Sequence, residues 1–190
     1  MSKVKHLRHT GLLGFFGGWL IIFLAISRNS WFVFTENAFS DLGNTAANDP
    51  WIFNFGMMLN GLLVLLYGLY LVYVSFNKRG SVGGAFMMIT GVFLSLIGFF
   101  PEGTRHHTSV SYWFFIQGDL SILVWGLALI QERRWRRESW VFLLLSTLGP
   151  LGAVLVPWPS IAAVETYGIL LMNTWVIIMR HITPEFPATG

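Results

Sequence analysis

The sequence predicts an all-α polytopic membrane protein with six transmembrane helices and both termini in the cytoplasm. Of its 190 residues, 54% are hydrophobic and only 11% are charged, whereas a soluble domain has about 25% charged residues. Apolar stretches long enough to cross a bilayer recur along the chain, and lysine and arginine gather on alternate sides of them. The composition therefore excludes a soluble monomer, and its apolar and aromatic content excludes a disordered chain.

Six stretches contain the roughly 20 mainly apolar residues that a transmembrane helix needs. The tails and loops between them are short, apart from the long outer loop 28–50, so we expect residues 1–190 to form a single six-helix membrane domain. The first stretch follows Lys3, Lys5 and Arg8, a pattern that a cleaved signal peptide also shows. Its apolar run is long for a signal peptide, which favours a retained helix. The predicted spans are 11–27, 51–76, 82–100, 110–131, 139–156 and 161–180.

Each span ends at residues that stop a helix or favour water over lipid. Asp49-Pro50 gives the second span an ordinary helix start. The breaks between successive spans are Arg28-Asn29-Ser30, Asn77-Lys78-Arg79-Gly80, Pro101-Glu102-Gly103, the charged segment 132–138 and Pro157-Trp158-Pro159.

The basic residues predict the orientation. With the N-terminus inside, the inner segments hold ten lysines and arginines, and the outer segments hold only Arg28 and Arg105. By the positive-inside rule this predicts a multi-pass protein of the cell membrane with cytoplasmic termini. Contact with anionic lipid head groups explains the net charge of +3. We therefore expect membrane lipids as partners and no nucleic acid, and a homo-oligomer is a possible assembly.

Two outer connections carry the densest set of reactive side chains. Hydroxyl, carboxylate and imidazole groups can act as acids, bases or metal ligands, and a guanidinium can hold a phosphate. The simpler alternatives are that Ser40-Asp41, followed by Gly43, caps a helix, and that the second connection is a solvated loop. The candidate catalytic residues are Ser40, Asp41, Glu102, His106 and His107.

Two further acids lie inside predicted spans. Asp119 is nine residues into the fourth span, about 13 Å deep at 1.5 Å per residue, and Glu165 is near the start of the last span. An intramembrane acid is costly and ordinarily faces the bundle interior beside a partner. We therefore take Asp119 and Glu165, together with Arg105, as candidate ligand-binding residues. A structural hydrogen-bonding role for Asp119 is the alternative.

The absence of cysteine narrows the chemistry. It excludes disulfide scaffolds, iron–sulfur clusters and thiol nucleophiles. If a metal is present, a divalent ion such as zinc would have Asp41, Glu102, His106 and His107 as its ligands. Neighbouring histidines on a regular helix point about 100° apart, so both would reach one ion only from an irregular loop.

Short motifs along most of the chain resemble those of an uncharacterised domain-of-unknown-function family of six-span membrane proteins, found mostly in archaea and bacteria. The chain is more distantly similar to DRAM/Frag-type membrane proteins. The resemblance implies the six-span topology and draws attention to Ser40, Asp41, Glu102 and a loop histidine, but it implies no activity. The motifs are Ser40-Asp41-Leu42-Gly43, Phe53-Asn54-Phe55-Gly56, Gly61, Gly98-Phe99-Phe100-Pro101-Glu102, His106 or His107, and Phe114-Phe115.

Membrane hydrolases of the alkaline-ceramidase type provide a contrast, because they hold zinc with three histidines, an aspartate and a serine. Only His106 and His107 are expected on the outer side of this chain. A zinc site here would therefore need carboxylates to complete it.

Together these patterns favour an integral membrane protein that binds or hydrolyses a lipid at a polar Ser/Asp/Glu/His cluster on its outer face. A small transporter or proton-coupled carrier that uses Asp119 and Glu165 is one alternative, and it requires a polar route below Asp119. A non-catalytic structural or partner-binding protein is the other. Whether the chain is an enzyme stays open at the level of sequence.

Overall fold

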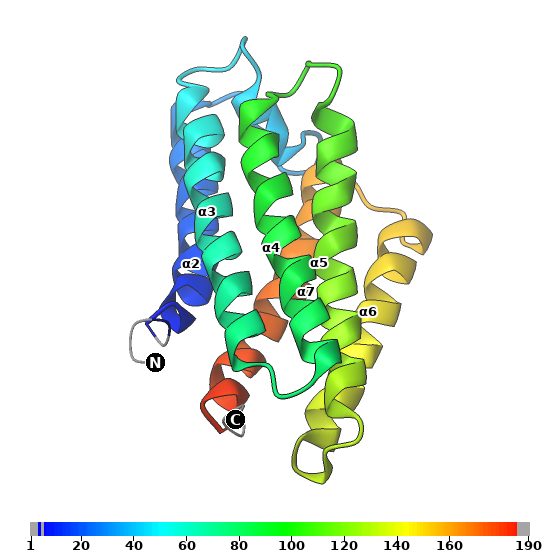
Figure 1. Cartoon of the computed structure of the whole chain (residues 1–190). Helices are drawn as coiled ribbons and strands as arrows, with labels where there is room; N and C mark the ends of the chain where they lie inside the picture. The colour runs from blue at the N-terminus through cyan, green and yellow to red at the C-terminus, as the bar shows by residue number, and fades with distance from the viewer. Residues whose placement is uncertain (1–3, 5, 186–190) are drawn as a thin grey trace.

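Six long helices form a bundle in the computed structural model, which describes residue 4 and residues 6–185 (Figure 1). Each helix is long and apolar enough to cross a membrane, and each coincides with one of the six predicted stretches. No strand occurs among the described residues, so the all-α, six-helix prediction is confirmed. The long helices are α2 (Arg8–Arg28), α3 (Trp51–Val74), α4 (Lys78–Phe99), α5 (His107–Leu129), α6 (Arg136–Leu155) and α7 (Ile161–Ile182), and the short 3-10 helices are η1 (Phe39–Gly43), η2 (Arg133–Trp135) and η3 (Thr183–Glu185).

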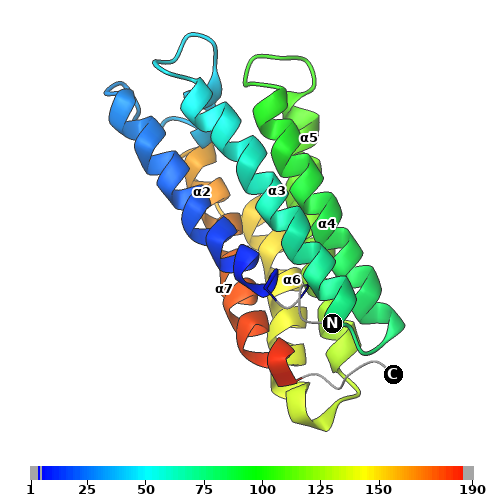
Figure 2. The ribbon, with the colours of Figure 1, turned by 60° about the vertical axis from the view of Figure 1, so that its left-hand side comes forward.

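Successive helices are neighbours in space. Helices α2 to α6 pack in chain order, and α7 closes the bundle by packing against α2, α5 and α6. Figure 2 shows α7 beside α2, and Figure 1 shows α6 at the edge of the bundle. Below, the end of the bundle that carries η1 is the cap end, and the opposite end, where α2 begins and α7 finishes, is the terminal end.

The closest helix pair is α3 and α4, which meet through glycines. A Cβ atom placed on Gly91 would lie 2.6 Å from the carbonyl oxygen of Gly61, and one placed on Gly61 would lie 2.5 Å from that of Gly91. Small residues allow two helix backbones to approach closely. In a membrane the hydrophobic effect does not drive helices together, so this close packing contributes much of their association. Ser95 adds a hydrogen bond from its hydroxyl to the Met58 carbonyl at 3.0 Å.

The connection between α2 and α3 folds over the cap end. Its Phe39 and Leu42 side chains are buried against the bundle. The Ser160 hydroxyl donates to the Phe34 carbonyl at 2.6 Å, and the Asn54 amide donates to the Gly43 carbonyl at 2.8 Å. These bonds fasten an irregular segment to α7 and α3, and so hold η1 in a fixed place.

The terminal end contains a dense aromatic core. Trp125, Phe142 and Trp175 are fully buried there, on three different helices. Buried serines bond to neighbouring helices: Ser121 donates to the Gly83 carbonyl and Ser139 to the Gly126 carbonyl, both at 2.8 Å. This end is therefore packed and its serines are satisfied.

The α3–α4 contact predicts an unusual response to alanine. Gly91→Ala raises helix propensity by about 1 kcal/mol, yet its methyl group would press on the α3 backbone, so we expect a net loss of about 1–3 kcal/mol of stability. Gly17→Ala is the control, since its nearest neighbour would be the Asn60 side chain at an ordinary 3.4 Å. Thermal unfolding in detergent tests both, and equal midpoints would contradict this account of the interface.

Candidate functional site

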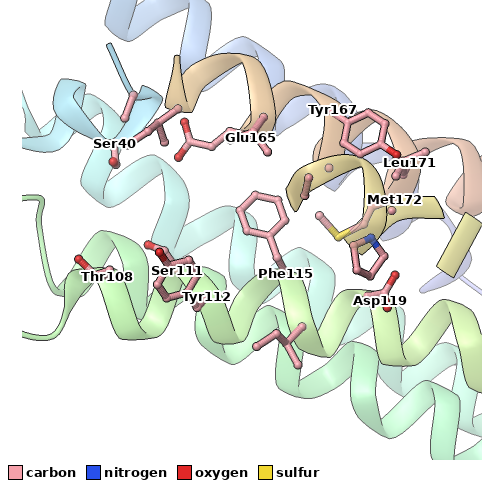
Figure 3. Close-up of a pocket in the computed structure, with 18 of the residues that line it drawn as sticks. Ser40, Thr108, Ser111, Tyr112, Phe115, Asp119, Glu165, Tyr167, Leu171 and Met172 are labelled. Atoms are coloured by element: carbon pink, nitrogen blue, oxygen red, sulfur yellow. The ribbon is translucent and has the colours of Figure 1, made fainter. Parts of the chain in front are cut away.

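A cavity of about 870 Å³ lies between α5, α6 and α7 and reaches η1 at the cap end (Figure 3). Helix α5 lines it with His107, Ser111, Phe115 and Asp119, which are four residues apart and so share one face. Across the cavity, α7 contributes residues spaced by three or four, and α6 contributes a wall with little side-chain bulk. The α7 and α6 residues are Ile161, Val164, Glu165, Tyr167, Gly168, Leu171, Met172, Gly149, Pro150, Ala153 and Val154.

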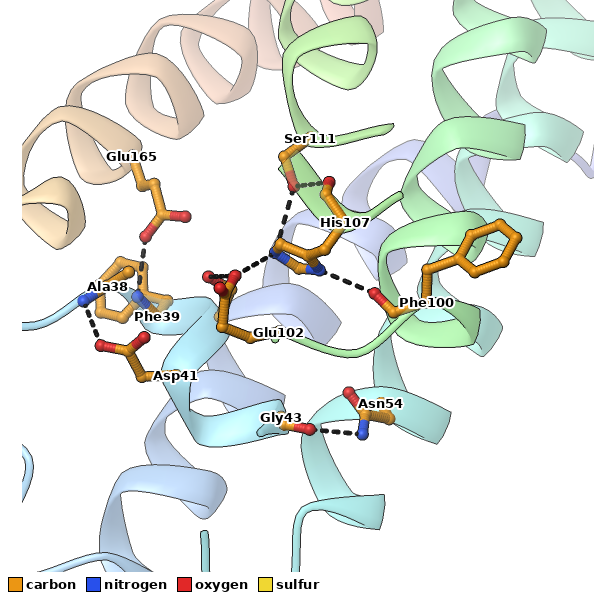
Figure 4. Close-up of polar contacts among 11 residues, drawn as sticks. Ala38, Phe39, Asp41, Gly43, Asn54, Phe100, Glu102, His107, Ser111 and Glu165 are labelled. Atoms are coloured by element: carbon orange, nitrogen blue, oxygen red, sulfur yellow. Dashed lines mark hydrogen bonds and ion pairs between the residues drawn. The ribbon is translucent and has the colours of Figure 1, made fainter. Parts of the chain in front are cut away.

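Polar residues gather where the cavity meets the cap end (Figure 4). A carboxylate oxygen of Glu102 lies 2.9 Å from Nε2 of His107, and the Ser40 hydroxyl donates to the same oxygen at 3.4 Å. Ser111 lies one helical turn below His107, with its hydroxyl 3.3 Å from Nε2. Gly103, whose φ of +89° favours glycine, forms the turn directly after Glu102. The chain thus brings η1, the α4–α5 loop and α5 together at one point.

The hydrogen-bond partners of His107 limit the protonation states of the His107–Glu102 pair to two. Its Nδ1 is 2.7 Å from the Phe100 carbonyl oxygen, which can only accept, so Nδ1 carries a hydrogen. The 2.9 Å contact between Nε2 and Glu102 then also needs a proton between the two atoms. The pair is therefore either imidazolium with carboxylate or neutral imidazole with carboxylic acid, and both forms can exchange a proton with a neighbouring molecule.

Two other carboxylates position η1. Asp41 accepts the Ala38 amide hydrogen at 2.9 Å and so caps its own 3-10 helix, as the capping alternative proposed. Glu165, from α7, accepts the Phe39 amide hydrogen at 2.8 Å. Both acids nevertheless line the cavity, so each combines a structural contact with a place on its wall.

The arrangement differs from a hydrolytic triad. In a triad the serine and the acid bind opposite nitrogens of the histidine, whereas here Ser111 and Glu102 both approach Nε2. Ser111 also donates to the His107 backbone carbonyl at 3.0 Å. The geometry therefore supports proton exchange at the Glu102–His107 pair but does not prepare Ser111 as a nucleophile.

The predicted metal ligands are not brought together. Across residue 4 and residues 6–185, no three His, Cys, Asp or Glu side chains form a group that could hold a metal ion. Glu102 and His107 are in contact, but Asp41 bonds to its own turn and His106 is exposed, with its ring 5.3 Å from that of Phe100. His106 caps α5 and His107 is its first residue, so the two neighbouring histidines point in different directions.

The other candidates also separate. Ser40, Asp41, Glu102, His107, Asp119 and Glu165 line the cavity, which unites six of the eight candidate residues. Arg105 is exposed and does not line it. The hypothesis that Arg105 holds a phosphate beside these acids therefore lacks the geometry that it needs.

Asp119 faces the deep part of the cavity, as Figure 3 shows. The Asp119 carboxylate makes no hydrogen bond or ion pair with any residue that the structure describes, so the partner expected for a buried acid is missing. Below Asp119 the cavity ends at Ile122, above the aromatic layer of Trp125, Phe142 and Trp175. The polar route that a transporter requires is thus closed in this conformation.

Comparison with known proteins places the chain in a family. A family model described as "Protein of unknown function (DUF998)" matches residues 12–181. The chain belongs to this family. The match confirms the resemblance to an uncharacterised family, whereas nothing supports the more distant likeness to DRAM/Frag-type proteins. No curated protein and no solved structure matches the chain.

The DUF998 match runs from the first turns of α2 to the end of α7, so it includes every residue of the cavity. Within it, sequence reasoning missed Ser111, Phe115 and the small residues of α6. The four-residue spacing from His107 through Ser111 to Asp119 could have indicated that these side chains share one face. Nothing in the sequence indicated the Phe39 amide, because it is a backbone group.

The bond between Glu165 and the Phe39 amide predicts a local change in this DUF998 chain. Glu165→Leu removes the acceptor, so the Phe39 amide hydrogen should exchange about tenfold faster, corresponding to about 1.4 kcal/mol of lost hydrogen bonding. Glu165→Gln keeps an acceptor oxygen and should preserve most of the protection. Hydrogen–deuterium exchange with mass spectrometry measures both, and unchanged exchange in the leucine variant would show that Glu165 does not hold η1.

Proposed function

We propose that the chain binds a membrane amphiphile with a cationic head group in the cavity between α5, α6 and α7. The volume of about 870 Å³ is near the upper end of ligand pockets, which run from about 300 to 1,000 Å³. Apolar residues line most of the cavity, and polar residues are concentrated at the cap end. This division suits a molecule that has an alkyl chain and a polar head group.

The exposed part of the lining supports entry from the side. Tyr112 on α5 is 67% exposed and Val154 on α6 is 81% exposed, and both also line the cavity. In a bilayer these surfaces face lipid tails, so an amphiphile could pass between α5 and α6 without leaving the membrane. A soluble ligand would gain nothing from an apolar entrance of this kind.

The single observation that carries the head-group assignment is the charge of the lining. Four carboxylates, those of Asp41, Glu102, Asp119 and Glu165, line the cavity, and within the described part of the chain no lysine or arginine does. His107 offsets Glu102, so the lining leaves Asp41, Asp119 and Glu165 without a positive side chain. Uncompensated negative charge is costly in a low-dielectric site, so a positive ligand relieves it, whereas a phosphate adds to it. The aromatic rings of Tyr112, Phe115 and Tyr167 would also favour a cation.

The test compares three probes that share one alkyl chain: hexadecylamine, hexadecanol and hexadecyl phosphate. Each is titrated into the protein in lipid nanodiscs, and the bound fraction is measured by native mass spectrometry. We expect one amine per chain, bound about tenfold or more tightly than the phosphate, because a charge-assisted hydrogen bond contributes about 1.5–3 kcal/mol. Glu165→Gln should remove much of this preference and leave hexadecanol binding unchanged.

Glu36→Gln is the matched control, because Glu36 is an exposed carboxylate in the same connection as η1 and does not line the cavity. Phosphate binding equal to amine binding would contradict the head-group assignment while leaving an amphiphile site. No saturable binding of any probe would contradict the site itself.

Lipid hydrolysis is a second candidate, and the observation that favours it is the Glu102–His107 pair. A group that exchanges a proton at 2.9 Å could activate a water molecule beside a bound ester or amide. The mass of the bound amphiphile distinguishes the two functions, since a binding protein returns its ligand intact.

We also propose that the cap end faces the outside and that both termini lie in the cytoplasm. At the terminal end, the first turn of α4 carries Lys78 and Arg79, and η2 with the start of α6 carries four arginines, at positions 133, 134, 136 and 137. At the cap end, the connections contain only Arg105, with Arg28 at the end of α2. Positive residues are retained on the cytoplasmic side during insertion. The cavity would then open at the outer leaflet.

Cysteine labelling in intact cells tests this orientation, because the chain has no cysteine of its own. Thr104→Cys and Gln131→Cys place single thiols at exposed positions in the α4–α5 and α5–α6 connections. A membrane-impermeant maleimide should label the first variant and spare the second until the cells are permeabilised. The reverse pattern would overturn the orientation.

A further inference from the structure

A second, smaller space of about 120 Å³ runs along the axis of the bundle, separate from the proposed ligand cavity. Helices α2, α3, α4, α5 and α7 surround it, and α6 takes no part. We call this space the inner chamber. It meets the ligand cavity at shared lining residues, which are Ser40, Ser111, Phe115, Glu165 and Met172.

Two amide side chains on the wall of the inner chamber have no protein partner. Asn60 of α3 is 6% exposed, and its Oδ1 atom has no hydrogen bond within the described part of the chain. The same holds for Nδ2 of Asn173 on α7. In a membrane core an unsatisfied polar group costs several kcal/mol, so two amides on one chamber indicate a hydrogen-bonding occupant.

The chain makes room for the Asn60 amide. A Cβ atom on Gly18 of α2 would lie 3.0 Å from Nδ2 of Asn60, and one on Gly14 would lie 3.5 Å from Oδ1. These glycines form the part of α2 that faces the amide, so no side chain of α2 fills the space around it. An apolar residue at position 60 would pack there without any unsatisfied atom, which makes a purely structural explanation of the asparagine incomplete.

The size and the lining of the inner chamber match water. A space of about 120 Å³ has room for several water molecules. Each buried water needs two to four polar partners, and the wall offers hydroxyls as well as amides. The Thr90 hydroxyl donates to the Phe86 carbonyl at 2.9 Å and keeps its lone pairs for a further bond.

We infer that the inner chamber holds a cluster of ordered waters that links Asn60 and Asn173 to Glu165. Glu165 lines both spaces and uses one carboxylate oxygen for the Phe39 amide, which leaves the other oxygen for water. The cluster hydrates Glu165 from the side of the inner chamber, opposite the ligand cavity. When an amphiphile fills the ligand cavity and displaces bulk water, Glu165 keeps hydrogen-bond partners and a route for proton exchange.

X-ray hydroxyl-radical footprinting tests this inference, because radicals form from water at the place where it is bound. Met57 and Met87 line the inner chamber and are only 6% and 3% exposed. Met179 is 0% exposed and lines neither space, so it is the internal control. In nanodiscs we expect Met57 and Met87 of the wild-type chain to be oxidised several-fold faster than Met179.

Two leucine variants and one control variant complete the test. Asn60→Leu and Asn173→Leu remove the polar partners, so they should lower oxidation of Met57 and Met87 toward the level of Met179. Thr174→Val is the matched control, since Thr174 is exposed next to Asn173, bonds only to its own helix and lines neither space. Protection of Met57 and Met87 equal to that of Met179 in the wild type would overturn the inference, whatever the variants do. Unchanged oxidation in both leucine variants would do so as well.

Discussion

A membrane core offers polar groups no bulk water, and this constraint determines where the polar residues of the bundle can lie. Many of them bond to a backbone carbonyl, either of their own helix, as Thr90 does to Phe86, or of a neighbouring helix, as Ser121 does to Gly83. Three of the exceptions face empty space: Asp119 faces the ligand cavity, and Asn60 and Asn173 face the inner chamber. Other buried atoms without a hydrogen-bond partner among the described residues, such as the Tyr67 hydroxyl and Gln117 Oε1, line neither space. At Asp119, Asn60 and Asn173, unsatisfied polarity beside empty space is the pattern expected of sites that something else completes.

The spaces themselves result from uneven packing. Glycines bring α3 and α4 into backbone contact, so that pair leaves no room for a ligand. Among the long helices, α6 packs mainly against α5 and α7, and the part of it that faces the ligand cavity is Gly149, Pro150, Ala153 and Val154. Pro150 also lacks the backbone N–H that would bond to the preceding turn. Under the proposed function, this thin wall at the edge of the bundle is where an amphiphile would enter.

Sequence alone could predict the six helices, because a membrane span needs length and hydropathy and little else. It could also predict that Ser40, Asp41, Glu102 and one of the two neighbouring histidines come close, since topology puts both connections at one end of the bundle. It could not choose between His106 and His107 or reject Arg105. Those outcomes depend on where the irregular loop ends and α5 begins, because His106 caps the helix, His107 is its first residue and Arg105 stays in the exposed loop.

The sequence also could not predict which face of each helix points into the bundle. In a soluble helix the apolar stripe marks the interior, but a membrane helix is apolar toward lipid as well as toward its neighbours. Helix α5 accordingly carries large apolar residues all round, with Trp113 and Ile116 exposed and Trp125 buried. The ligand cavity became visible only when α6 and α7 were placed against the His107–Asp119 face.

The depth of Asp119 sets a condition that any ligand of this cavity must meet. It lies twelve residues below His107 on α5, which is about 18 Å along a helix axis. A cationic head group held by Asp41 and Glu165 at the cap end would therefore lie far above Asp119, and only the alkyl part of a simple amphiphile would reach that depth. An isolated carboxylate against an alkyl chain is unfavourable. A ligand that fills the whole cavity must then carry a second hydrogen-bonding group near Asp119, or that acid must be neutral in the complex. A probe with one head group, such as hexadecylamine, reaches only the acids at the cap end and leaves Asp119 without a partner. A natural ligand with polar groups at both depths should therefore bind more tightly than any of the three probes.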